Sequence, residues 1–91
     1  MATKRQGKFM PTDTKQDFDA ELVTLGLECP LPVLKARKRL GEMPEGAVLC
    51  LVCDDPLSAI DVPFFCSEAG HELLSTVTTG PEMRYRIRKR G

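Results

Sequence analysis

The chain has 91 residues, of which 42% are hydrophobic and 29% are charged, a composition typical of one small soluble globular domain. Basic and acidic residues balance at a formal net charge of +0, so bulk charge does not indicate a nucleic-acid partner. No apolar stretch approaches the roughly 20 residues of a membrane span, and no secretory signal peptide is recognisable. We therefore expect a cytoplasmic protein whose four cysteines are free thiols.

The first half of the chain predicts a strand, a helix and a second strand. A short strand is expected over residues 20–25, and an amphipathic helix over residues 29–40. Gly41 suits the C-terminal end of this helix. The run at 47–53 has the length and the valine and leucine content of a strand. Because this run is apolar on both faces, we expect the outer side of the sheet to be partly covered, by the N-terminal residues or by a partner.

The second half of the chain predicts a second helix and two further strands. Asp55 suits the N-cap of the helix, which Gly70 ends. Pro63 must kink or split the helix, because it lacks an N–H and crowds the preceding turn. Residues 73–79 and 83–88 read as strands of a hairpin. Apolar residues recur in the second helix at helical spacing: Leu57, Ile60 and Phe64.

This order of elements, β-α-β-α-β-β, predicts an α/β two-layer sandwich. Two helices would pack on one face of a four-stranded mixed sheet. The first β-α-β unit is expected to be a right-handed parallel crossover, and the last two strands a hairpin. We expect this domain to occupy residues 20–91, and residues 1–19 to form a flexible N-terminal tail, since they lack periodicity and mix charges with glycine and proline.

Cys29 is the residue with the clearest predicted chemistry. It stands at the start of the first predicted helix, followed by Pro30 and Pro32. Proline fits the first helical position and stiffens the chain that carries the thiol. The positive end of the helix dipole favours an anion, so we expect a lowered pKa for the Cys29 thiol and a reactive sulfur. The alternative is a small apolar residue that packs at the start of a helix.

The other cysteines and the single histidine predict packing rather than chemistry. Cys50 and Cys53 have the spacing of a redox pair, but in a strand their side chains would point to opposite faces. Cys66 lies among phenylalanines in the second helix, where burial makes a thiol inert. A zinc site from these three cysteines and His71 is not expected, because the strand separates the first two ligands. A structural role is expected for His71 near the end of the second helix.

Residues 22–91 carry five short motifs in order, at spacings that need no insertion. The motifs are Gly26-x-x-Cys29-Pro30-x-Pro32, Cys53-Asp54-Asp55-Pro56, Pro63-x-Phe65-Cys66, His71-Glu72-Leu73, and Arg84-Tyr85 with Ile87-Arg88-Lys89. With these motifs the chain resembles the TusA/SirA-like sulfur-carrier family, whose fold agrees with the predicted one. Val23 stands where members often have Asp, Glu28 where relatives can be basic, and Leu31 where some have Glu. Because of these departures, the resemblance does not identify which proteins donate and accept the sulfur.

The resemblance implies a sulfurtransferase that carries sulfur as a persulfide on Cys29. A cysteine desulfurase would donate the sulfur, and an acceptor protein would receive it for tRNA thiolation, molybdenum cofactor sulfuration or sulfur metabolism. No cofactor and no metal would be bound by the chain itself, because the chemistry is thiol exchange. Direct contacts with nucleic acid or membrane are not expected.

Basic residues on the first predicted helix suggest where a partner would bind. Lys35, Lys38 and Arg39 should share its outer face and steer an acidic partner toward the thiol. The resemblance implies that Arg37 and Lys38 contact partners. It implies the same of Asp55, although N-capping alone explains that residue.

Two other classes of function remain open at this stage. One is a small thiol redox module in which Cys29 forms mixed disulfides while Cys50 and Cys53 cycle. The other is a non-catalytic binding or regulatory module that uses the basic helix and would still bind after loss of Cys29.

Overall fold

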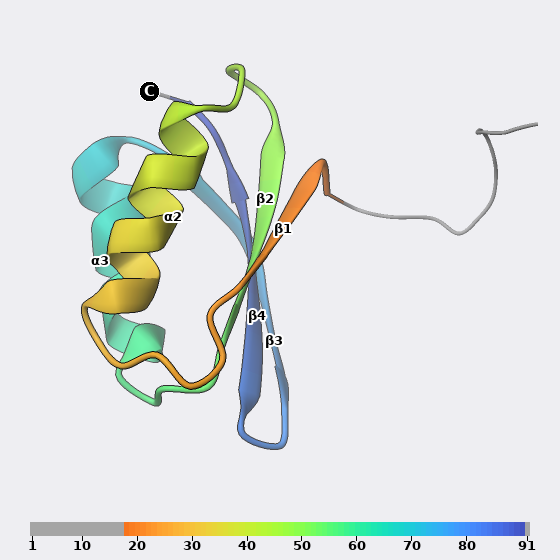
Figure 1. Ribbon diagram of the computed structural model, residues 1–91. Helices are drawn as coiled ribbons and strands as arrows, with labels where there is room; N and C mark the ends of the chain where they lie inside the picture. The colour runs from red at the N-terminus through yellow and green to blue at the C-terminus, as the bar shows by residue number, and fades with distance from the viewer. Residues whose placement is uncertain (1–17, 91) are drawn as a thin grey trace, which may run out of the picture.

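The computed structural model describes residues 18–90, which form four strands and two helices. The elements are β1 (Ala20–Val23), α2 (Leu31–Gly41), β2 (Val48–Cys53), α3 (Ser58–Ala69), β3 (Glu72–Thr79) and β4 (Glu82–Arg88). Both helices cover the same face of the sheet (Figure 1). This α/β two-layer sandwich confirms the predicted fold class and order of elements. The predicted tail at 1–19 lies outside the described residues, apart from its last two positions.

The four strands form one mixed sheet in the order β1-β2-β4-β3. β1 and β2 run parallel, whereas β4 runs antiparallel to both β2 and β3. β3 and β4 form the predicted hairpin, and Gly80 in its turn has a φ of 60°, a conformation that glycine adopts without steric cost. The carboxyl ends of the two parallel strands lie at one edge of the sheet. At that edge the chain turns into α2 after β1 and into α3 after β2.

The hydrophobic core lies between the sheet and the two helices. Alternation along β2 directs Leu49, Leu51 and Cys53 toward the helices. From α2, Ala36 and Leu40 are fully buried, one turn apart on the inner face. The core also contains Met43, Val62, Phe65, Cys66, Met83, Tyr85 and Ile87. Burial of each large apolar side chain stabilises the fold by about 1.5–3 kcal/mol, so this layer holds the helices against the sheet.

An ion pair crosses the central strand on the sheet face opposite the helices. Cys50 and Val52 of β2 point to this face, yet they are only 3% and 1% exposed. Arg84 of β4 and Glu21 of β1, from the strands on either side of β2, are joined by an Nη1–Oε2 contact of 3.0 Å. The expected cover over the outer side of β2 is therefore supplied in part by the side chains of its own neighbouring strands.

The helices differ from the sequence prediction at their starts and at one proline. α2 begins at Leu31, later than expected, and Pro30 is its N-cap residue, with non-helical dihedral angles of φ −99° and ψ 15°. α3 begins at Ser58, after a turn in which the Ser58 N–H donates to the Asp55 carbonyl. Pro63 lies inside α3 without splitting it. Its missing N–H leaves the Ala59 carbonyl without a helical partner, and Ala59 is exposed, so water can hydrogen-bond there.

Candidate functional site

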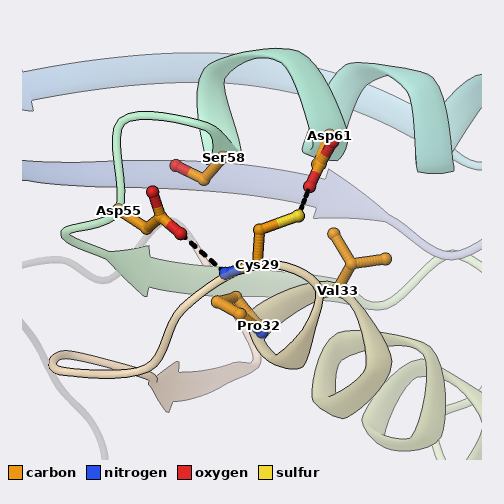
Figure 2. A pocket seen from close by; sticks show the side chains of 6 residues that line it. All are labelled: Cys29, Pro32, Val33, Asp55, Ser58 and Asp61. Atoms are coloured by element: carbon orange, nitrogen blue, oxygen red, sulfur yellow. Dashed lines mark hydrogen bonds between the residues drawn. The ribbon is translucent and has the colours of Figure 1, made fainter.

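Cys29 lies in the loop between β1 and α2, at the sheet edge where both parallel strands end. Figure 2 shows its side chain directed toward Asp61 of α3. All four cysteines are free, but Cys50, Cys53 and Cys66 are buried whereas Cys29 is half-buried. Cys29 is therefore the cysteine whose sulfur a partner can reach without unfolding the domain.

Two carboxylates that follow β2 hold the Cys29 loop in place. Oδ2 of Asp55 accepts a hydrogen bond from the N–H of Cys29 at 2.6 Å, and its Oδ1 accepts one from the N–H of Leu57 at 3.0 Å. Both oxygens of Asp54 accept from the N–H of Gly26, at 3.0 and 3.1 Å. The bonds from Cys29 and Leu57 lower the pKa of Asp55, because they stabilise its charged form.

The Cys29 thiol is held protonated rather than activated. Its Sγ donates a hydrogen bond to Oδ2 of Asp61 (Figure 2). This bond, then desolvation, then the negative charges of Asp61 and Asp55 raise the pKa of Cys29 from 9.0 to about 11. The predicted lowering of this pKa is therefore wrong. The N–H of Leu31 donates to the Glu28 carbonyl, not to the sulfur, so the start of α2 does not offset the two carboxylates.

A groove of about 370 Å³ runs between α2 and α3 beside the sulfur. It is lined by Cys29, Pro30, Val33, Arg37, Asp61, Phe64, Phe65 and Glu68. A smaller hollow is lined by Cys29, Pro32, Val33, Asp55, Ser58 and Asp61 (Figure 2). Cys29 and Asp61 line both spaces, and Pro30 and Pro32 line one each. The thiol and this carboxylate therefore lie where the groove and the hollow meet.

The residues predicted to contact partners are distributed unevenly around the sulfur. Arg37 lines the groove, and its guanidinium carbon lies 5.2 Å from the centroid of the Phe65 ring, within range of a cation–π contact. Lys38 is exposed on α2 but does not line the groove. Asp55 binds two backbone N–H groups, and this structural role accounts for its place in the motif. Arg37 is thus the predicted partner residue that lies beside the thiol.

Apolar side chains are exposed on both helices and just before α3, and one of them, Phe64, lines the groove. Five of them are between 45% and 69% exposed: Leu31, Leu34, Leu57, Ile60 and Phe64. The sequence shows an apolar stripe on α3 but not the direction in which it faces. Val62 and Phe65 occupy the buried side of α3. The stripe of Leu57, Ile60 and Phe64 therefore points outward, because a helix packed on a single sheet has only one face to bury. An exposed apolar side chain beside the groove, such as Phe64, is suited to contact a partner.

Sequence reasoning missed Asp61 and Ser58. Asp61 is 32 residues from Cys29 in the chain, and no local motif pairs the two. The hydroxyl of Ser58 is buried 2.8 Å from that of Tyr85, and Ser58 also lines the hollow. The available signal was topological: both residues lie in the first turns of a helix that follows β2, the parallel partner of the strand before Cys29.

Other candidate sites in the sequence do not form. Cys50 and Cys53 lie on opposite faces of β2, as predicted, with Cys53 in the core beneath the helices. His71 lines neither space beside Cys29; its Nδ1 accepts a hydrogen bond from the N–H of Arg90 at 3.1 Å. Among residues 18–90 no group of His, Cys, Asp and Glu side chains is arranged to hold a metal ion. Over the same range, the helices are too short or too polar to cross a bilayer.

Comparisons with known proteins show the fold and the family of the chain. A crystal structure of a SirA-like protein from Desulfitobacterium hafniense matches with a TM-score of 0.71 and 23% sequence identity, over 80% of this chain and 100% of that chain. The similarity shows a shared fold. The family model described as sulfurtransferase TusA matches residues 21–89, which include Cys29, Asp55 and Asp61. The chain therefore belongs to the TusA family of sulfurtransferases.

Proposed function

We propose that this chain carries sulfur as a persulfide on Cys29. The observation on which this rests is the unequal burial of the cysteines: Cys29 is half-buried beside a groove, and the other three are buried. A carrier needs one accessible nucleophile on a rigid base. Hydrogen bonds from the loops to Asp54 and Asp55 supply that rigidity.

A cysteine desulfurase, a pyridoxal-phosphate enzyme that forms a persulfide on its own cysteine, is the proposed donor. The sulfur of Cys29 attacks the outer sulfur of that persulfide, and the donor thiol leaves. A thiol of an acceptor protein then attacks the outer sulfur held on Cys29. Each step exchanges one sulfur–sulfur bond for another, so the chain itself needs no cofactor. Thiolation of tRNA, sulfuration of the molybdenum cofactor and sulfur metabolism are the candidate destinations.

The surface around the thiol supports a protein partner. Phe64 lines the groove and is 65% exposed, and Ile60, about one turn before it on α3, is 69% exposed. Arg37 adds a positive charge on the opposite wall. Apolar anchors next to a charged side chain are typical of protein interfaces, and both a donor and an acceptor could use this surface in turn.

The test is to incubate the full chain with a cysteine desulfurase and free cysteine, then to measure its intact mass with and without reductant. We expect a gain of one sulfur atom that reductant removes. The gain should vanish in Cys29→Ser and persist in Cys66→Ser, the matched control at a buried thiol. No gain with any of several desulfurases would contradict the carrier function. A gain that survives in Cys29→Ser would assign it to another cysteine.

A further inference from the structure

Asp61 has an unusual place for a carboxylate on a partly exposed helix. It lies on the side of α3 that faces Cys29, and it lines both the groove and the hollow at the sulfur. Within residues 18–90 no lysine or arginine forms an ion pair with it. Its hydrogen-bond partner among these residues is the Cys29 thiol. A half-buried carboxylate whose hydrogen bond goes to the nucleophile is placed to control the proton on that nucleophile.

Resting on the proposed carrier function, we propose that Asp61 is a catalytic residue that holds the proton of Cys29 in the free carrier and accepts it during sulfur transfer. The hydrogen bond from Sγ to Oδ2 defines the path of the proton (Figure 2). Asp55, the other carboxylate at the hollow, has both oxygens engaged by backbone N–H groups. Asp61 is therefore the carboxylate in hydrogen-bond contact with the sulfur.

The transfer step balances with Asp61 as the proton acceptor. The sulfur of Cys29 attacks the outer sulfur of the donor persulfide as the thiol proton moves to Oδ2 of Asp61. The sulfur–sulfur bond of the donor breaks, and its electron pair leaves on the donor's inner sulfur as a thiolate. This thiolate then takes the proton from Asp61. One sulfur–sulfur bond forms and one breaks, no net oxidation occurs, and Asp61 returns to its starting state.

The same contact keeps the unoccupied carrier unreactive. The charged groups that face the sulfur are Asp55 and Asp61, while Arg37 and Glu68 line the groove farther along the helices. The net charge of the groups nearest the Cys29 sulfur is therefore negative, in agreement with the raised Cys29 pKa of about 11. At neutral pH the free carrier would expose a thiol with very little thiolate, and small electrophiles and oxidants react mainly with the thiolate. Transfer would then depend on a bound donor rather than on chance encounter.

The experiment compares Asp61→Asn with Glu45→Gln, a matched loss of charge at an exposed carboxylate that lines neither the groove nor the hollow. In the free full-length chain, the rate of Cys29 alkylation by iodoacetamide is measured against pH by intact mass. Asp61→Asn should lower the apparent pKa of Cys29 and raise the rate at pH 7.5 by roughly tenfold for each unit of that fall. In single turnover with a loaded desulfurase, the same variant should take up sulfur more slowly, by roughly tenfold or more. Glu45→Gln should change neither rate.

These opposite changes distinguish a catalytic carboxylate from a structural one. An unchanged alkylation profile in Asp61→Asn, or an uptake rate that rises with the alkylation rate, would overturn the proposal. If no variant, nor the wild type, takes up sulfur, the carrier function fails, while the alkylation profile still decides the role of Asp61. Should Asp61→Asn not fold, the wild-type profile remains decisive, because an apparent pKa of Cys29 at or below that of an ordinary thiol would overturn the proposal.

Discussion

Asp55 and Cys29, 26 residues apart in the chain, are joined by a hydrogen bond of 2.6 Å from the N–H of Cys29 to Oδ2 of Asp55. This bond connects the loop after β1 to the loop after β2, and so sets the position of the thiol relative to α3. The same carboxylate also accepts the N–H of Leu57, just before the helix begins. A single side chain thereby fixes both the thiol-bearing loop and the start of the helix that carries Asp61.

Replacing Asp55 should change the pH dependence of the stability of the fold. Its pKa in the folded protein lies below the ordinary value of 3.8, so its charged form stabilises the fold above that pH. This contribution is lost as the pH falls from about 4 through the lower folded pKa. We expect Asp55→Asn to be less stable than wild type at pH 7, with a thermal midpoint lower by roughly 4–8 °C.

The measurement is urea or thermal unfolding of both proteins between pH 7 and pH 2. The gap between the two midpoints should narrow below pH 4, because the wild type then loses the charge that the variant lacks. Glu45→Gln, at an exposed carboxylate, is the control and should follow the wild type. A gap that stays constant down to pH 2 would show that the charge of Asp55 does not stabilise the fold.

Alkylation should separate Cys29 from the other cysteines. Burial raises the pKa of Cys66 to about 11 and also raises the pKa values of Cys50 and Cys53. In the native protein we expect one adduct, at Cys29, that forms faster as the pH rises toward 11. Denaturant should expose all four cysteines. Intact mass and peptide mapping provide the measurement, and Cys29→Ser should give no adduct under native conditions; a native adduct at Cys50 would contradict the burial described above.

Two leucines on α2 should respond very differently to truncation. Leu40 is fully buried in the core, whereas Leu34 is 51% exposed on the same helix. Leu40→Ala should lower the free energy of unfolding by about 2–5 kcal/mol, because it removes apolar contacts and leaves a cavity. Leu34→Ala should change it by less than about 0.5 kcal/mol. Urea unfolding measures both, and similar losses in the two variants would mean that α2 packs on a different face.

The exposed apolar side chains on α3 should matter for transfer and not for stability. Ile60, 69% exposed on α3 about one turn before Phe64, which lines the groove, is the first to replace with serine. If the donor packs against it, sulfur uptake at a limiting donor concentration should fall roughly tenfold, the effect of losing an interface contact worth about 1.4 kcal/mol. Alkylation of Cys29 and the unfolding midpoint should not change, since the side chain touches neither the sulfur nor the core.

Val77→Ser is the matched control for Ile60→Ser. Val77 is 54% exposed on β3, and it pairs in register with Arg84 on the sheet face away from the helices. Uptake by this variant should match the wild type. Equal losses in the two variants would indicate a general effect of removing surface apolar groups rather than a docking surface on α3.

Local signals in the sequence predicted the elements and their order. The alternation of residues 83–88, the apolar run at 47–53 and the terminating Gly70 each act over a few residues, so they can be read without knowledge of the fold. The parallel crossover followed from the order of elements, since a helix between two strands places them side by side in parallel. Cys29 and its prolines were recognisable because motif and helix start coincide in the chain.

What the tertiary structure alone decided were the contacts between distant segments and the electrostatics that they produce. The predicted thiolate at a helix start became a thiol with a raised pKa, because packing brings Asp61 to the sulfur. The packing of α3 on the sheet also leaves Leu57, Ile60 and Phe64 exposed. The order of the strands places Arg84 and Glu21 on either side of β2, where they form an ion pair. A dipole or a cap acts within a few residues, whereas these effects depend on which side chains meet in space, and the sequence specifies that only through the folded chain.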